Sequence, residues 1–406
     1  MFAALVALAA LAFACGAHVD PAAAAPPTVR FATFNVSMFR AQQGELGEEL
    51  TDPAMEQARA AAAILQEVRP DVVLLNEFDW DPRGESARLF RQNFLAVGQG
   101  GRQPIDYPYA YVPEVNTGVP SGLDLDRDGK IVTEPGSRAY GGDAFGFGEF
   151  SGQYGFIVLS RFPIEIENVR SFRLLRWRDL PGAAIPEGWY SSQALDRLRL
   201  SSKNHVDVPI RIGGRVVHLL ASHPTPPTFD GPEDRNGARN ADEIRFWSLY
   251  LQQADAEWLI DDRGRAGVFG DGSFVIVGDL NSDPVDGDSR HQAIRDLLAN
   301  PRLQGAPVPV SAGAAEQARL QGGINAVQVG DPAQDTADFE GLRVGNLRLD
   351  YVLPSVDLPI ERSGVFWPTM SDPQFALVGT YPFPVSDHRL VWVDVSVVTR
   401  PERTAR

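Results

Sequence analysis

Residues 276–284 read IVGDLNSDP, and the chain changes from apolar to polar within them. The residues at 274–277 are all apolar and are typical of a buried strand. Asp279, Asn281 and Asp283 follow at once, so acid and amide groups lie where the strand leaves the core. Strand ends on one rim of a sheet converge in space. The stretch therefore indicates an α/β fold with a polar site at the edge of a sheet.

The apolar patterns along the rest of the chain predict strands interspersed with helices. Gly213-Gly214 separates two strand patterns and predicts a hairpin turn. The predicted strands are 29–36, 71–75, 154–160, 164–170, 205–212, 215–221, 273–278, 347–353 and 388–397, and the predicted helices are 53–68, 84–96, 239–262 and 288–299. This order predicts a single α/β domain over 26–400, with two packed sheets and helices outside. Long polar stretches at 114–150, 171–204 and 300–345 are predicted loop insertions.

Polar groups lie where several predicted strands begin or end, and we expect them to form one acidic pocket that also contains histidine. They are Asn35, Glu77, His223, Asp279, Asn281, Asp387 and His388, and Asp350 lies within a further predicted strand. Carboxylates that are held close together repel one another, and a bound cation stabilises them. Carboxylates, amides and histidines without cysteine suit a hard divalent ion, so we expect Mg²⁺ or Mn²⁺.

Short motifs along the chain carry a family resemblance. They are TFN at 33–35, NE at 76–77, SHPTP at 222–226, GDLN at 278–281, LDYV at 349–352 and SDH at 386–388. In this order they resemble the endonuclease/exonuclease/phosphatase superfamily, the metal-dependent phosphoesterases that include pancreatic-type deoxyribonuclease, apurinic endonucleases and neutral sphingomyelinases. Asn76 departs from the family, which usually has glutamine there. The resemblance implies a four-layered α/β sandwich, in which two mixed, mostly antiparallel sheets pack face to face with helices outside.

The resemblance also implies which residues hold the metal. Glu77 would be the principal ligand, and Asn35 beside it would bind metal or phosphate. Asp387 could take a second metal. The alternative for any one of these residues is an ordinary cap or turn at a strand end.

The remaining matching residues would perform the hydrolysis of a phosphate ester by in-line attack of water. Asp279 would orient and deprotonate the water, and Asn281 would donate its amide to a phosphoryl oxygen. His388 would contact the phosphate and stabilise the transition state, oriented by Asp350. His223 is a general-acid candidate. Taken singly, Asp279 could instead be a turn residue, Asp350 a core carboxylate and His223 a loop residue.

Asp124, Asp126 and Asp128, followed by Gly129, have the spacing that begins a calcium loop. The twelfth position is Pro135 where such loops have glutamate, so structural Ca²⁺ and a plain solvated turn are both open.

Tryptophans at 177, 189 and 367 lie in or near predicted loops. They could form an apolar wall for a lipid or a base, or pack in the core.

The first 25 residues predict an export signal. Residues 2–14 are apolar or small and too few to span a bilayer. Cys15 is the single cysteine, and it is either a lipid-anchored mature N-terminus or removed with the signal. We therefore expect an exported protein that is periplasmic, secreted or lipid-anchored, with membrane contact only through that anchor.

The formal net charge of −16 disfavours nucleic acid as a partner, because an acidic protein repels a polyanion. The leading hypothesis is an exported, monomeric, metal-dependent phosphoesterase that acts on a small molecule or a phospholipid. The alternatives are a secreted nuclease and a catalytically silent module that binds calcium and a partner.

Overall fold

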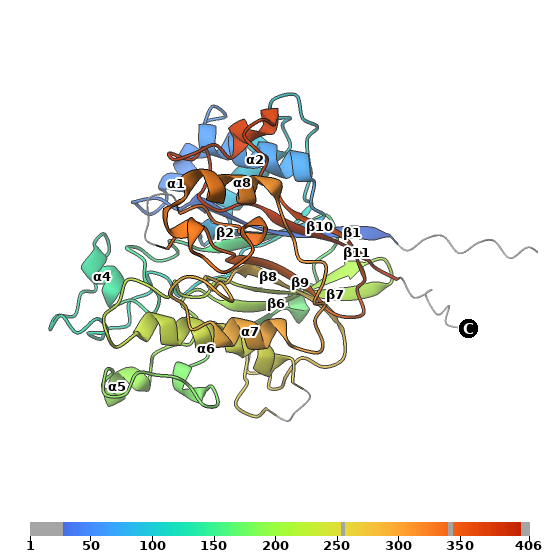
Figure 1. The fold of residues 1–406 in the computed structure, drawn as a ribbon. Coiled ribbons are helices and arrows are strands. Elements are labelled where there is room, and N and C mark those ends of the chain that lie inside the picture. Colours follow the sequence, from blue (N-terminus) through green and yellow to red (C-terminus); the bar gives the residue numbers. More distant parts are fainter. Residues whose placement is uncertain (1–26, 253–255, 340–343, 399–406) are drawn as a thin grey trace, which may run out of the picture.

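The computed structural model describes residues 27–252, 256–339 and 344–398, which form two stacked sheets covered by helices (Figure 1). In spatial order the first sheet contains β10 (Ile360–Val365), β11 (Val391–Ser396), β1 (Thr28–Met38), β2 (Val72–Phe78), β4 (Phe156–Ser160) and β3 (Tyr109–Tyr111). The second contains β5 (Arg170–Ser171), β6 (His205–Ile212), β7 (Arg215–Ser222), β8 (Ser273–Asp279) and β9 (Asp350–Pro354). Each sheet has one parallel pair, β1 with β2 and β7 with β8, and its other pairs are antiparallel. The predicted fold class is confirmed.

Helices cover the outer face of each sheet. Figure 1 shows α2 (Glu56–Val68) and α8 (Ala312–Gln321) above the sheets, and α6 (Arg235–Tyr250) and α7 (Gln292–Leu298) below them. The shorter helices are α1 (Glu45–Glu49), α3 (Glu85–Phe90), α4 (Arg138–Gly142), α5 (Ser192–Leu195) and the π-helical turn η1 (Arg91–Leu95). The 3₁₀ turns are η2 (Ile166–Asn168), η3 (Trp177–Asp179), η4 (Gly323–Ala326), η5 (Pro332–Gln334) and η6 (Pro373–Leu377).

β8 explains how the two cores form. Its side chains alternate, so Val275 and Val277 pack in the core between the sheets. Phe274 and Ile276 point the other way and pack with α6 and α7. All four side chains are buried, which accounts for the unbroken apolar run in the sequence.

Several predicted elements are wrong in type or extent. The helix predicted over 239–262 begins at Arg235 and ends at Tyr250, whose carbonyl accepts the backbone N–H of Phe269 at 2.8 Å in place of a helical partner. The strand predicted over 164–170 is interrupted by the turn η2, and strand β5 begins only at Arg170. The predicted loop 300–345 contains α8, and β3 and β10 were not predicted. The hairpin of β6 and β7 is confirmed.

The predicted export signal, 1–25, and Cys15 lie outside the described residues. Within the part of the chain that the structure describes, no helix is both long and apolar enough to span a bilayer.

Candidate active site

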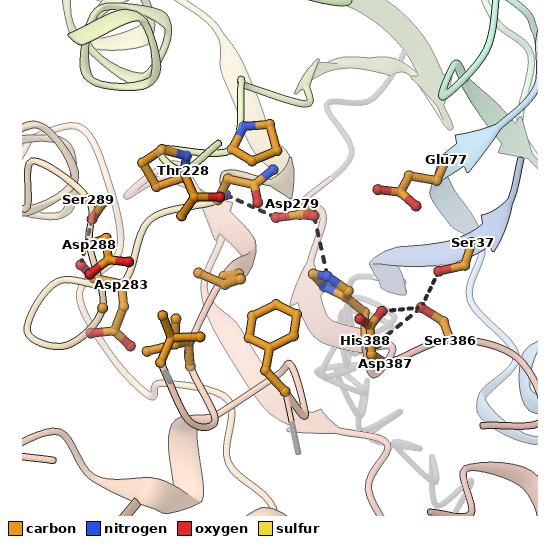
Figure 2. Close-up of a pocket in the computed structure, with 18 of the residues that line it drawn as sticks. Ser37, Glu77, Thr228, Asp279, Asp283, Asp288, Ser289, Ser386, Asp387 and His388 are labelled. Atoms are coloured by element: carbon orange, nitrogen blue, oxygen red, sulfur yellow. Dashed lines mark hydrogen bonds and ion pairs between the residues drawn. The ribbon is translucent and has the colours of Figure 1, made fainter. Parts of the chain in front are cut away.

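The polar residues predicted at strand ends lie together at one edge of the sandwich (Figure 2). β1 and β2 are parallel and both end there, with Asn35 and Glu77. The parallel strands β7 and β8 bring His223 and Asp279 to the same edge. β9 runs antiparallel to β8 and begins at this edge, where Asp350 pairs with Asp279. The topology therefore brings together residues that are far apart in the chain.

Two carboxylates flank the ring of His388. Its Nδ1 lies 2.8 Å from Asp350 Oδ2, which also accepts a hydrogen bond from Thr336 Oγ1 at 2.8 Å. Its Nε2 lies 3.7 Å from Asp279 Oδ2. Burial opposes the charge on His388, but Asp350 and Asp279 outweigh it and raise the pKa of His388 well above its ordinary value. The arrangement therefore favours an imidazolium held in one orientation.

Asp279 has donors on both carboxylate oxygens. Asn35 Nδ2 donates to Oδ2 at 3.1 Å, and the backbone N–H of Asn281 donates to Oδ1 at 2.9 Å. Burial raises the pKa of Asp279 to about 6, although the positive charge of His388 opposes that rise. A carboxylate with a pKa just below neutral can both exist as the base and bind a proton.

Asn281 takes part in a turn and also lines the pocket. Its backbone makes the Asx-type turn with Asp279, at a positive φ of 52°. Its side-chain Nδ2 lies at the pocket and donates to the carbonyl of Pro224 at 3.2 Å. Because an amide nitrogen carries two hydrogens, Asn281 can still offer one to a ligand.

Two of the three residues predicted to bind metal, Glu77 and Asp387, line the same pocket and offer carboxylate oxygen atoms there. Asn35 is not among the described residues that line it. Its Nδ2 donates to Asp279 Oδ2 at 3.1 Å, and its Oδ1 accepts the backbone N–H of Ser37 at 3.1 Å. Burial raises the pKa of Glu77 to about 7, and the negative charges of Asp279 and Asp387 add to this while His388 opposes it. This strained group of carboxylates fits a hard divalent cation, which would relieve the repulsion.

Some donors predicted to act in catalysis could also hold an ion. Asp279, Asp350 and His388 each offer an atom within 4.8 Å of the others. Asp350 Oδ1 is buried and has no hydrogen-bond partner among the described atoms.

His223 is 2% exposed, and its Nε2 lies 3.5 Å from Asp279 Oδ2. Neither ring nitrogen has a hydrogen-bond partner in the described structure. Burial lowers the pKa of His223 well below its ordinary value, and the positive charges of Lys203 and His388 add to this effect. His223 is therefore neutral, which disfavours its predicted action as a general acid.

Lys203 was not predicted. It is 6% exposed, and its Nζ donates to the carbonyl of Pro224 at 3.5 Å, directly after His223. Burial lowers its pKa, while the charges of Glu243, Glu77 and Asp279 oppose that change. The sequence could have pointed to Lys203 only through the scarcity of lysine, which occurs only at positions 130 and 203.

The site residues line a pocket of about 750 Å³. Backbone strain is concentrated around it, because most of the described non-glycine residues with positive φ line this pocket. They are Ser37, Glu77, Tyr154, Phe229 and Asn281. Strained residues persist where the surrounding structure holds them, which is common at functional sites.

The apolar part of the pocket is lined by aromatic rings other than those of the tryptophans. Trp177 and Trp367 are buried in the core, and Trp189 is not among the described residues that line the pocket. The aromatic rings that line it are those of Phe39, Tyr154, Phe229, Phe339, Tyr381 and Phe383. Phe229 and Tyr381 are 84% and 75% exposed. Of the two alternatives open for the tryptophans, packing in the core is therefore the one that holds for Trp177 and Trp367, and phenylalanine and tyrosine line the pocket.

The three carboxylates of the predicted calcium loop lie close together. Asp124, Asp126 and Asp128 each offer a carboxylate oxygen within 4.8 Å of the others. The same loop accepts its own backbone N–H groups, with Gly129 donating to Asp124 at 3.1 Å. Calcium binding there stays a prediction.

Comparison with known proteins agrees with the motifs. The model of the endonuclease/exonuclease/phosphatase family matches residues 32–388. No curated protein matches the chain.

Solved structures of low sequence identity align with most of the chain. An endonuclease/exonuclease/phosphatase from Beutenbergia cavernae is 19% identical, with a TM-score of 0.48, and the alignment covers 91% of this chain and 72% of that one. Sphingomyelinase C from Streptomyces griseocarneus is 15% identical, with a TM-score of 0.43 and coverages of 91% and 98%. A family match over this length identifies the chain as a member of the endonuclease/exonuclease/phosphatase family, the metal-dependent phosphoric ester hydrolases.

Proposed function

We propose that this protein is exported and hydrolyses a small phosphodiester or phosphomonoester, or the head group of a phospholipid. The observation that carries the proposal is the contact series from Asp350 through His388 to Asp279, of which His388 and Asp279 line the pocket. The pocket volume of about 750 Å³ is typical of sites that take small molecules.

Asp279 is our candidate for the base that activates water. It is deprotonated at neutral pH, and its two hydrogen-bond donors hold the carboxylate in place. A general base must lie within hydrogen-bond reach of the water from which it takes a proton. We place that water between Asp279 and the phosphorus atom, opposite the leaving oxygen.

His388 is our candidate for stabilising the charge that develops on the phosphoryl oxygens. An imidazolium held by Asp350 supplies a fixed positive charge in a buried site, where electrostatic stabilisation is strong. Asn281 would donate its remaining amide hydrogen to another phosphoryl oxygen. His223, which is neutral, would donate a hydrogen bond and would not transfer a proton.

Glu77, Asn35 and Asp387 would hold a divalent cation, and we propose Mg²⁺ or Mn²⁺ because the donors are oxygen atoms. When bound, such a cation neutralises charge on phosphoryl oxygens.

The test is hydrolysis of bis-p-nitrophenyl phosphate by the purified protein with Mg²⁺, Mn²⁺ or EDTA. We expect metal-dependent turnover that Asp279→Asn and His388→Ala each lower by at least about 10²-fold. Asp106→Asn, an exposed aspartate outside the pocket, is the matched control and should leave turnover unchanged.

Circular dichroism would establish that each variant folds. Unchanged turnover in a folded Asp279→Asn variant would show that the site lies elsewhere. A wild-type protein that binds metal but cleaves no ester would instead support the silent binding module.

A further inference from the structure

We propose that the substrate carries a positive charge in addition to its phosphate, and that an acidic wall of the pocket recognises that charge. The acidic wall consists of Asp283, Asp286 and Asp288, which follow β8 and line the pocket. The inference rests on the proposed function and names the substrate class of the same site: phosphate esters of ammonium-bearing alcohols.

The acidic wall lies across the pocket from the proposed metal ligand. Figure 2 shows Asp283 and Asp288 on one side and Glu77 on the other, with Asp279 and His388 between them. A phosphate held at Asp279 and His388 therefore has room on the side of the acidic wall for a substituent.

The charges around the pocket are unbalanced. Its carboxylates are those of Glu77, Asp279, Asp283, Asp286, Asp288 and Asp387. Of the described residues that line it, none is lysine or arginine. The basic side chain among them is His388, whose pKa is raised well above its ordinary value. A divalent cation and His388 offset the carboxylates near the phosphate. Among the described residues that line the pocket, the acidic wall has no such counter-charge, so it attracts a cationic substituent and repels an anionic one.

Two members of the acidic wall are fixed by the backbone. Asp283 accepts the N–H groups of Val285 and Asp286, both at 2.7 Å. Asp286 accepts those of Val329 and Gly330 at 3.0 and 2.7 Å. These bonds orient the carboxylates without neutralising their charge, so the wall is preorganised for a cation.

Asp288 is the member best placed to meet a ligand directly. Its side chain is exposed, and the described structure gives its carboxylate no hydrogen bond. A substitution at Asp288 therefore changes the charge of the wall without disturbing a bond that the fold needs.

Asp335 provides a second sign of the negative field. It is more than nine-tenths buried, and its Oδ2 has no hydrogen-bond partner among the described atoms. Burial raises the pKa of Asp335 to about 8, and the charges of Asp283 and Asp286 add to that rise. Asp283 and Asp286 thus add negative charge near a buried carboxyl group that is not among the described residues lining the pocket.

Aromatic rings select the kind of cation. Phe229, Phe339 and Tyr381 line the same pocket as the acidic wall. The faces of aromatic rings attract cations, and alkylated ammonium groups also bury apolar surface against them. The combination of rings and carboxylates fits a quaternary ammonium group better than a strongly hydrated inorganic cation.

The test compares two esters of the same shape. One is p-nitrophenyl phosphocholine, and the other is p-nitrophenyl 3,3-dimethylbutyl phosphate, in which carbon replaces the charged nitrogen. With Mg²⁺ or Mn²⁺ present, we expect kcat/KM to be about tenfold higher for the choline ester at low salt. The preference should fall in high salt, because exposed charges are screened.

Variants then locate the preference. Asp288→Asn should reduce it about threefold, and Asp288→Lys should abolish it. Asp106→Asn, which removes an exposed charge outside the pocket, should leave it unchanged.

Equal kcat/KM values for the two esters, with both hydrolysed, would overturn this inference and leave the phosphoesterase function standing. Failure to hydrolyse either ester or bis-p-nitrophenyl phosphate would overturn both. Glycerophosphocholine and phosphatidylcholine vesicles then distinguish a soluble ester from a membrane lipid as the carrier of the ammonium group. A further result would also count against the inference. In it, neither glycerophosphocholine nor phosphatidylcholine is cleaved, and ethyl p-nitrophenyl phosphate is cleaved as fast as the choline ester.

Discussion

His223 lies 3.5 Å from Asp279, and its protonation state decides what it can do there. Its pKa is well below the ordinary value, because burial and the nearby charges of Lys203 and His388 oppose protonation. A neutral imidazole has one N–H to donate as a hydrogen bond, but it does not readily give that proton away. We therefore propose that the residue contributes to binding of the phosphate and not to departure of the alcohol.

This assignment predicts how His223→Gln affects two diesters with different leaving groups. We expect kcat/KM to fall by a similar factor, about tenfold, for a p-nitrophenyl and for an alkyl leaving group. A general acid would matter far more for the alkyl group, because the alkoxide is a poor leaving group. His218→Gln, outside the pocket, is the control. A loss with the alkyl ester about 10²-fold greater than with the p-nitrophenyl ester would restore the general-acid role.

Asp279, Glu77 and His388 could be predicted because each lies in a short motif next to an apolar strand. The position of Lys203 could not be predicted, since it reaches the site through a loop that packs under Pro224. Of the acidic wall, only Asp283 could be singled out in the sequence, as part of the stretch 276–284. The role of the wall depends on which residues line the pocket with it, and the sequence does not show this.

At the scale of elements, Gly278 explains how β8 can pass from core to site. Its φ is 155°, and a Cβ added there would lie 2.0 Å from the carbonyl oxygen of Ser222 in β7. The parallel strands β7 and β8 therefore approach each other at a point where a side chain does not fit. This close approach puts His223, which follows Ser222, beside Asp279.

Gly278→Ala should lower the free energy of unfolding by about 3 kcal/mol, because backbone at β7 or β8 must shift. Urea denaturation followed by circular dichroism would measure the change. Gly270→Ala is the matched control, since a Cβ there meets nothing within 4 Å. Wild-type stability and activity in a folded Gly278→Ala variant would show that the close approach is not needed.

The central strands could be predicted, and the edges and helix ends could not. β8 is buried on both faces and has an unbroken apolar run, whereas β10 is an edge strand with Glu361, Arg362 and Ser363 in its middle. β10 forms because β11 offers it a partner, which no local pattern reveals. The end of α6 likewise involves a contact between distant residues, because the carbonyl of Tyr250 accepts the backbone N–H of Phe269.

At the scale of the whole molecule, the net charge of −16 opposes the approach of DNA. Proteins that bind DNA without help neutralise its phosphates with lysine and arginine, and the described lining of this pocket contains neither. We therefore expect supercoiled plasmid to remain intact in the buffer and metal that support hydrolysis of bis-p-nitrophenyl phosphate. Gel electrophoresis would detect nicking, with pancreatic deoxyribonuclease as the positive control. Nicking by the wild type that disappears in Asp279→Asn would mean that the protein is a nuclease, and that bound cations suffice to reverse the field of the molecule.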